Sequence, residues 1–233
     1  MSFRRFMIII MILLSLPFFS CQKKTQKIWL HKANDIEDAQ HFQHEYAGLE
    51  IDITYIDSLQ TFLILHGGGH FEPNPVTFEK WINEIDNIKN LGLWLDFKNL
   101  DENNAKASLD EMNRLYSEYK LQKNNTIVES KKAAYLKDFQ KDGFKVSYYI
   151  PDFKPNSVSQ SELQEYTDKI QMMTSENNMT TISGYYYQYQ YMRDSFPDLD
   201  LLLWYNKYNK IVKNKYIRIA NNDDKVKILL VKD

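Results

Sequence analysis

Short apolar runs rich in β-branched and aromatic residues alternate with amphipathic stretches along the chain, and this alternation constrains the fold most strongly. Strands that alternate with helices favour a parallel sheet covered by helices. Eight runs have the pattern of strands: 27–33, 49–56, 62–68, 91–99, 125–130, 144–151, 180–187 and 199–206. Helices are expected between most of them: 36–46, 77–90, 103–120, 131–142, 159–174 and 188–195.

The number of strand–helix units predicts an α/β fold of the (β/α)8 TIM-barrel type. A doubly wound open sheet is the alternative. The tail, 215–233, has two β-like runs around the turn "NNDD" and is expected to add a C-terminal β-hairpin. Because no repeat or low-complexity linker interrupts the chain, residues 28–233 are expected to form a single barrel domain.

The N-terminus has the layout of a secretory signal. A short basic start precedes an apolar run that is brief for a membrane span, and the only cysteine, Cys21, follows a small residue. This arrangement resembles a bacterial lipoprotein processing site, which implies a signal peptide over 1–20 and a lipidated Cys21 with a tether over 21–27. The expectation is an exported, membrane-anchored lipoprotein of the cell envelope. Gln22 favours the outer membrane, and an uncleaved N-terminal anchor is the alternative.

The charge balance argues against a nucleic-acid partner. The chain has 29 basic and 31 acidic side chains and a formal net charge of −2. Loss of residues 1–20 would remove Arg4 and Arg5 and make the balance more acidic. No basic tract stands out, so a phosphate backbone has no evident binding surface.

Ionisable side chains occupy one face of four successive predicted strands. In "LEIDI" two acids alternate with apolar residues, and "LWLDFKN" places an acid and a lysine in the same way. A histidine alternates away from the apolar residues of 27–33, and another does so in 62–68. In a barrel these positions lie at the carboxyl ends of the strands, where barrel enzymes keep their chemistry. The residues are His31, Glu50, Asp52, His66, Asp96 and Lys98.

The three acids predict a metal site. Carboxylates that converge from adjacent strands repel one another unless positive charge lies between them, and desolvated charge is costly. Lys98 can neutralise one of them, and a hard cation such as Ca²⁺ or Mg²⁺ would neutralise the rest. His31 and His66 would flank the metal as a proton donor and acceptor, which suits phosphoryl transfer.

The order of these motifs resembles that of the glycerophosphodiester phosphodiesterases, within the phosphatidylinositol-specific phospholipase C-like barrel superfamily. The sequence segments "HKAND", "LEIDI" and "WLDFKNL" most closely resemble the menorin-type branch of this superfamily. The resemblance covers about residues 28–100. It implies a (β/α)8 barrel and a Ca²⁺ or Mg²⁺ cofactor. It also implies these roles: Glu50, Asp52 and Asp96 as metal ligands, His31 and His66 as the acid–base pair, and Lys98 on the phosphate.

Several residues depart from this pattern or add to it. Lys32-Ala33 stands where the family commonly has Arg-Gly, so Lys32 is expected to contact substrate in place of an arginine that would bind phosphate with two donors. Gly67 follows the second histidine where aspartate is usual. By position at strand ends, Glu129 and Trp204 are expected to line the site.

Three functions are compatible with these residues. The first is a metal-dependent phosphodiesterase that hydrolyses glycerol- or inositol-type phosphodiesters, with a small phosphodiester or lipid headgroup as partner. The second is a catalytically silent binding lipoprotein on the same barrel, which the missing arginine favours. The third is a glycoside hydrolase with paired carboxylates, which would need neither metal nor histidine.

Overall fold

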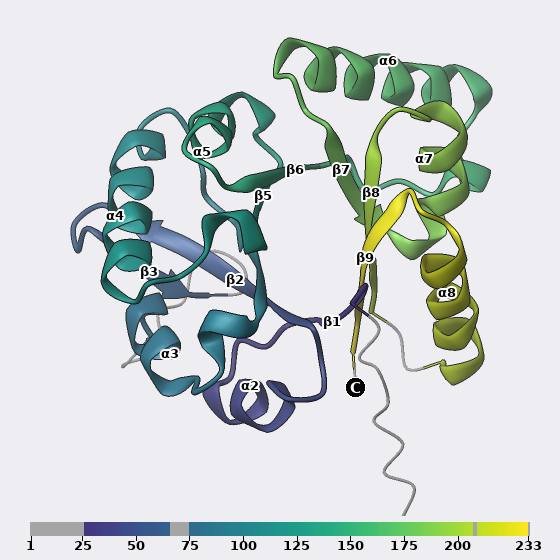
Figure 1. Cartoon of the computed structure of the whole chain (residues 1–233). Helices are drawn as coiled ribbons and strands as arrows, with labels where there is room; N and C mark the ends of the chain where they lie inside the picture. The colour runs from purple at the N-terminus through teal and green to yellow at the C-terminus, as the bar shows by residue number, and fades with distance from the viewer. Residues whose placement is uncertain (1–25, 66–74, 207–208, 233) are drawn as a thin grey trace, which may run out of the picture.

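The computed structural model describes residues 26–65, 75–206 and 209–232. Eight parallel strands in them close into a ring, because β9 pairs with β1 and β1 pairs in turn with β2 (Figure 1). The predicted (β/α)8 barrel is therefore confirmed, and the open sheet is wrong. In ring order the strands are β1 (Ile28–Leu30), β2 (Gly48–Ile56), β4 (Gly92–Phe97), β5 (Thr126–Ser130), β6 (Lys145–Tyr149), β7 (Thr181–Tyr185), β8 (Asp200–Tyr205) and β9 (Val226–Val231).

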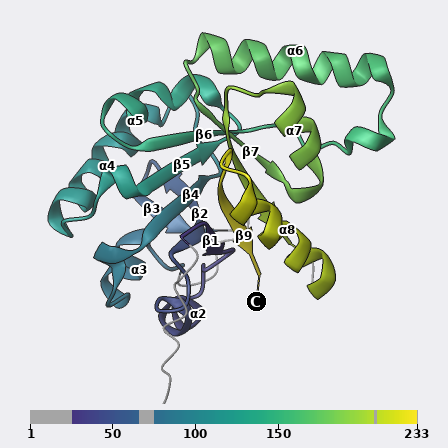
Figure 2. The same ribbon diagram turned by 45° about the vertical axis from the view of Figure 1, so that its right-hand side comes forward.

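Helices surround the ring on its outside (Figure 2). They are α2 (Ile36–Phe42), α3 (Phe78–Glu84), α4 (Ala105–Glu118), α5 (Lys137–Lys141), α6 (Gln160–Glu176), α7 (Tyr189–Ser195) and α8 (Lys210–Asn222). Single 3-10 turns cover Ile88–Asn90, Lys123–Asn125, Ala133–Tyr135, Pro155–Ser157 and Tyr186–Gln188. Side chains satisfy the free amides at several helix starts, as Ser159 and Glu162 do in a capping box at α6. In the described part of the chain no helix has the length and apolarity to span a membrane.

The predicted helix over 77–90 is too long. α3 ends at Glu84, and Ile85 leaves the helical region with φ −101° and ψ 105°. The Ile85 side chain is buried in the core, so the extended conformation keeps this apolar residue out of water.

The third predicted strand is not part of the ring. β3 (Thr61–Ile64) pairs antiparallel with β2 through a tight turn over 57–60 and lies outside the barrel. The physical reason is the length of this connection. A parallel crossover needs about a dozen residues, whereas an antiparallel hairpin needs only a few.

The predicted C-terminal hairpin is also wrong. Its first half belongs to α8, whose start is capped by Asn209, and its second half is β9, which completes the ring between β8 and β1. Val, Ile and Tyr residues make this segment look like a strand, but propensity is weak against tertiary packing. Closure of the barrel needs an eighth parallel strand, and β9 supplies it.

The apolar core has two parts. The larger lies between the ring and its helices and includes the predicted apolar face of β2, Leu49, Ile51 and Ile53, all fully buried. The smaller fills the inside of the ring. Its members are Trp29, Trp94, Ile127, Leu202, Trp204, Ile228 and Leu230.

Trp29 forms the floor of the barrel, at the amino end of the strands. A Cβ on Gly48 or on Gly92 would lie 2.3 Å from ring atoms of Trp29, much closer than van der Waals contact. Glycine is therefore required at the first residue of both β2 and β4, because the indole occupies the space that any larger residue would need. The Trp29 Nε1 also donates to the carbonyl oxygen of Gln26 at 3.1 Å.

Candidate metal centre and active site

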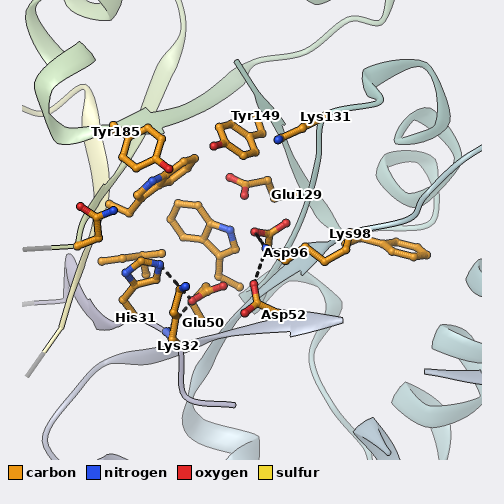
Figure 3. Close-up of a pocket in the computed structure, with 15 residues that line it drawn as sticks. His31, Lys32, Glu50, Asp52, Asp96, Lys98, Glu129, Lys131, Tyr149 and Tyr185 are labelled. Carbon is orange, nitrogen blue, oxygen red and sulfur yellow. Dashed lines mark hydrogen bonds and ion pairs between the residues drawn. The ribbon is translucent and has the colours of Figure 1, made fainter. Parts of the chain in front are cut away.

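The three acids that the sequence predicts as ligands meet at the mouth of the barrel, the carboxyl end of the ring strands. Asp52 on β2 and Asp96 on β4 are direct neighbours across the sheet, and Glu50 lies on the same face of β2. One carboxylate oxygen from each of these residues lies within 4.8 Å of the others. Figure 3 shows the three side chains turned toward one space. This confirms that alternation along two neighbouring strands brings the acids together.

The loop after β1 is attached to β2 by a series of hydrogen bonds. The backbone N–H of Lys32 donates to Glu50 Oε2 at 2.7 Å, and that of Ala33 donates to the Glu50 carbonyl at 2.8 Å. Asn34 Nδ2 donates to Asp52 Oδ2 at 2.7 Å, and Asn34 Oδ1 accepts from the Asp52 amide at 2.8 Å. Each acid of β2 therefore has one oxygen held by the loop, which orients its carboxylate.

Lys98 is the positive group among these acids. It forms ion pairs with both Asp52 and Asp96. Burial acts to lower the pKa of Lys98, but the attraction of the two acids outweighs burial and raises this pKa above its usual range. Lys98 is thus charged, as the sequence predicts, and it offsets one of the three negative charges.

The remaining negative charge is poorly compensated. Burial raises the pKa of Glu50 well above its usual range, and repulsion from Asp52 and Asp96 raises it further. Burial also raises the pKa of Asp96, against the influence of Lys98. The carboxylates of Glu50 and Asp52, which are buried, and of Asp96, which is partly buried, form an all-oxygen donor set of the kind that Ca²⁺ and Mg²⁺ bind. The residues present therefore fit the divalent cation that the sequence predicts.

His31 lies beside the acids at the end of β1. Its Nε2 is 3.7 Å from Glu50 Oε2, and its Nδ1 is buried without a hydrogen-bond partner in the described residues. Burial, reinforced by the charge of Lys32, lowers the pKa of His31 to about 3. The imidazole is therefore neutral at physiological pH.

Two predicted features fall outside the described residues. His66, the second predicted catalytic histidine, is in the segment 66–74, and Cys21 with the predicted signal peptide and most of the tether is in the segment 1–25. Their predicted roles stay predictions.

A pocket of about 290 Å³ opens above the acids. It brings together every predicted site residue that the structure describes, with Lys32, Glu129 and Trp204 among its walls. Sequence analysis did not single out six other polar or aromatic lining residues, although five of them stand at or just after the carboxyl ends of strands. These six are Trp94, Phe97, Lys131, Tyr149, Tyr185 and Asn206.

Glu129 is the fourth acid of the mouth. It lies on β5 as the direct neighbour of Asp96, is 1% exposed, and faces the pocket between Asp96 and Tyr149 (Figure 3). Burial, and then repulsion from Asp96, raises the pKa of Glu129 well above its usual range. Its Oε2 has no hydrogen-bond partner in the described part of the chain.

The barrel is similar to solved phosphodiesterase structures. A glycerophosphodiester phosphodiesterase from Parabacteroides distasonis matches with a TM-score of 0.63 and 14% identity, over 88% of this chain and 92% of that one. A phosphodiesterase from Oleispira antarctica in complex with the product sn-glycerol-3-phosphate matches with a TM-score of 0.58 and 11% identity, over 88% of this chain and 92% of that one. A glycerophosphodiester phosphodiesterase from Thermotoga maritima matches with a TM-score of 0.58 and 11% identity, over 88% of this chain and 93% of that one.

The chain therefore has the TIM-barrel fold of the glycerophosphodiester phosphodiesterases, and the resemblance predicted from its motifs is confirmed at the level of the fold. Neither protein-family models nor curated protein sequences give a match. The closer likeness to the menorin-type branch stays a prediction.

Proposed function

We propose that the protein is a metal-dependent phosphodiesterase that hydrolyses small glycerol- or inositol-type phosphodiesters at the cell envelope, anchored through a lipidated Cys21. The observation that carries this proposal is the convergence of three carboxylates, a charged lysine and a neutral histidine in one pocket at the barrel mouth. The shared fold supports it, because the similar structures include phosphodiesterases.

Each residue has a role that follows from its chemistry. Glu50, Asp52 and Asp96 would hold Ca²⁺ or Mg²⁺, which when bound supplies positive charge to the phosphate oxygens. Lys98 fixes the two aspartates and adds a second positive charge beside them. Lys32, on the same pocket wall as His31, supplies a further cation for the phosphate.

His31 is assigned the base role because its ring lines the pocket beside the acids, and its Nδ1 has no hydrogen-bond partner in the described residues. It accepts the proton of the attacking hydroxyl as the new phosphorus–oxygen bond forms. The bond to the leaving alcohol then breaks, and the alcohol oxygen needs a proton, for which His66 is the proposed donor. If the attacking hydroxyl belongs to the substrate itself, the first product is a cyclic phosphate.

The test is turnover of a panel of glycerophosphodiesters and an inositol phospholipid, with and without a chelator. We expect hydrolysis that is lost with chelator, restored by Ca²⁺ or Mg²⁺, and reduced at least ~100-fold by His31→Ala. Glu118→Gln, on the exposed end of α4, is the control and leaves the rates unchanged. Chelator-resistant cleavage of a phosphodiester or a glycoside would contradict the proposal.

One observation favours a second candidate, a catalytically silent barrel that binds ligand. Lys32 offers a single point charge where a two-pronged arginine contact would hold phosphate more firmly. Metal binding without turnover of any phosphodiester in the same panel would select this candidate.

A further inference from the structure

The outer helix α8 differs from the rest of the chain in its charge. The whole chain carries a formal net charge of −2, but every charged residue of α8 is basic: Lys210, Lys213, Lys215 and Arg218. Figure 1 shows α8 on the outside of the ring, beside β9 and next to α7. Because this segment resembles a strand in sequence, only its helical form shows which of these cations share one side.

α8 also leaves much of its surface exposed. Of its 13 residues only Ala220 is buried, whereas four of the 14 residues of α4 are buried. Ile211 is 83% exposed, more than any other large apolar side chain in the described residues. Ile211, Lys215 and Arg218 are spaced four and three residues apart, so they lie on one side of the helix. This outer face therefore combines an exposed apolar side chain with two cations.

A pocket of about 540 Å³ between α7 and α8 continues this face. Its charged lining residues are Arg193 on α7, Lys215 and Arg218 on α8, and Asp223 just after α8. Asp223 Oδ2 accepts from Arg193 Nε at 2.9 Å and from the Tyr189 hydroxyl at 2.8 Å. Lys215 and Arg218 form no ion pair within the part of the chain that the structure describes. The pocket therefore holds two positive charges that no acid offsets.

The start of the described chain is attached to the same end of α8. Lys27 Nζ donates to the carbonyl oxygens of Ala220 and Asp223, at 2.9 and 3.0 Å. The proposed lipidation site, Cys21, precedes Lys27 by six residues, and six residues span at most about 20 Å. A lipid on Cys21 would therefore hold a membrane surface within reach of this end of α8.

Charge and apolarity together indicate the partner. Basic residues alone would suit any polyanion, including a nucleic acid. Ile211 on the same face needs an apolar environment, which the region between lipid headgroups and acyl chains supplies and a phosphate backbone does not. Each Lys or Arg near an anionic lipid surface strengthens binding about 5-fold. The outer face of α8 therefore fits a lipid surface better than a nucleic acid.

We propose that the outer face of α8 and the adjoining pocket bind the surface of a membrane that contains anionic phospholipids. Ile211 enters the membrane interface, and Lys215 and Arg218 contact lipid phosphates. The contact sets which side of the barrel faces the membrane. It uses no residue that lines the pocket at the barrel mouth, so it can be tested without metal and without turnover.

The test is co-sedimentation with vesicles of phosphatidylcholine, with and without phosphatidylglycerol. The protein is the chain 22–233, which lacks the predicted signal peptide and lipidation site and contains all eight ring strands. We expect binding only to the vesicles with phosphatidylglycerol, and a loss of this binding as salt is raised. Equal binding to both vesicle types, or binding to neither, would overturn the proposal.

Substitutions on the outer face of α8 should weaken this binding. Lys215→Gln and Arg218→Gln should each do so about 5-fold, and Ile211→Ser should have a similar effect with little change in the salt dependence. Lys106→Gln is the matched control, since it removes an exposed cation from α4, and it should change nothing. Far-ultraviolet circular dichroism shows whether each variant is folded. Binding that none of the three α8 substitutions weakens would overturn the proposal.

A fluorescent label reports the contact of α8 directly. The chain 22–233 contains no cysteine, because Cys21 is the only one in the sequence. A polarity-sensitive dye on Ile211→Cys should shift its emission to shorter wavelength when anionic vesicles are added. The same dye on Ala107→Cys, an exposed position of α4, should not. No shift at either position, or an equal shift at both, would contradict docking through α8.

Other occupants of this surface would give different results. Inorganic phosphate that binds the protein and not Arg218→Gln, without vesicle binding, would indicate a site for soluble anions. A dimer that Ile211→Ser dissociates, without vesicle binding, would indicate contact with a second copy of the chain. Either result would overturn membrane docking. Vesicle binding as expected, without turnover of any diester, would overturn the proposed phosphodiesterase and leave this surface standing.

Discussion

The two ends of the barrel differ in the side chains that fill them, which are apolar at the floor and charged at the mouth. At the floor, Trp29 fills the ring against Gly48 and Gly92 and leaves no space for a larger residue. At the mouth, Glu50, Asp52 and Glu129 are buried and Asp96 is partly buried, with one lysine between the two aspartates. One oxygen of Glu129 has no partner in the described residues. The floor is packed around Trp29, with a pocket opening beside the indole, whereas the mouth gathers acids that a cation would compensate.

This difference separates stability from function. Close packing at the floor contributes to the free energy of unfolding and has no contact with the pocket. Buried like charges at the mouth reduce that free energy, and proteins keep such arrangements where binding or catalysis needs them. Substitutions at the floor should therefore change the free energy of unfolding, and substitutions at the mouth should change activity.

The largest effect is expected from Asp52→Asn at the mouth. The change removes one proposed metal ligand and one partner of Lys98. We expect kcat/KM on a phosphodiester to fall about 10³-fold or more, equivalent to about 4 kcal/mol. Chemical denaturation should show little loss of stability. If Asp52→Asn unfolds more easily and keeps its activity, the mouth serves stability rather than function.

Gly48→Ala at the floor should produce the next largest effect, this time on stability. The added Cβ would overlap the Trp29 ring, and overpacking of this kind costs about 3 kcal/mol. Denaturant unfolding measures this loss, while kcat of the folded fraction should stay unchanged. Trp29→Leu in the same chain removes the clash, so the double variant should lose less than the two single losses combined.

Glu50→Gln tests the mouth through the pH dependence of stability without metal. The raised pKa of Glu50 means that the folded state binds its proton more tightly than the unfolded state does. In chelator, the contribution of Glu50 to stability should therefore be greatest below pH 4.5, the ordinary pKa, and should decline as the pH rises through the folded pKa.

Glu50→Gln removes this decline and should be more stable than the natural protein at pH 7 by on the order of 1 kcal/mol. Thermal unfolding of both proteins at several pH values in chelator measures the decline and the difference in stability. Equal slopes for the two proteins would show that Glu50 is not destabilised by its neighbours.

The smallest effect is expected from Asp142→Asn. Asp142 pairs with Lys123 at 2.8 Å near the floor, and each side chain is about a third exposed. The hydrogen bond from Lys123 lowers the pKa of Asp142, so its contribution is present above pH 3.8 and is lost at lower pH. Because the pair is exposed, unfolding at pH 7 should show a loss of less than about 1 kcal/mol.

Much of the mouth could be predicted from the sequence because it depends on local rules. Alternation places Glu50, Asp52 and Asp96 on the inner face of their strands, and parallel strands bring their ends together. The position of His31 follows from the same rule. Asn34 lies three residues after His31 in the sequence, but its hydrogen bonds to Asp52 depend on how the loop after β1 folds back toward β2.

The parts that were missed depend on contacts distant in sequence. The run 62–68 has the composition of a ring strand, and only its short connection to β2 indicates a hairpin. In the tail, β-branched residues conceal a helix that packs against β9. The need for Gly48 and Gly92 appears only when Trp29 is placed between them.

Calorimetric titration of the metal-free protein with Ca²⁺ and with Mg²⁺ tests the mouth most directly. If Glu50, Asp52 and Asp96 share one cation, the titration should show a single site for at least one of these ions. Asp52→Asn or Glu50→Gln should abolish that site, and Gly48→Ala should leave it intact. No binding of either ion, or binding that survives the loss of both Glu50 and Asp52, would contradict a metal centre at this end of the barrel.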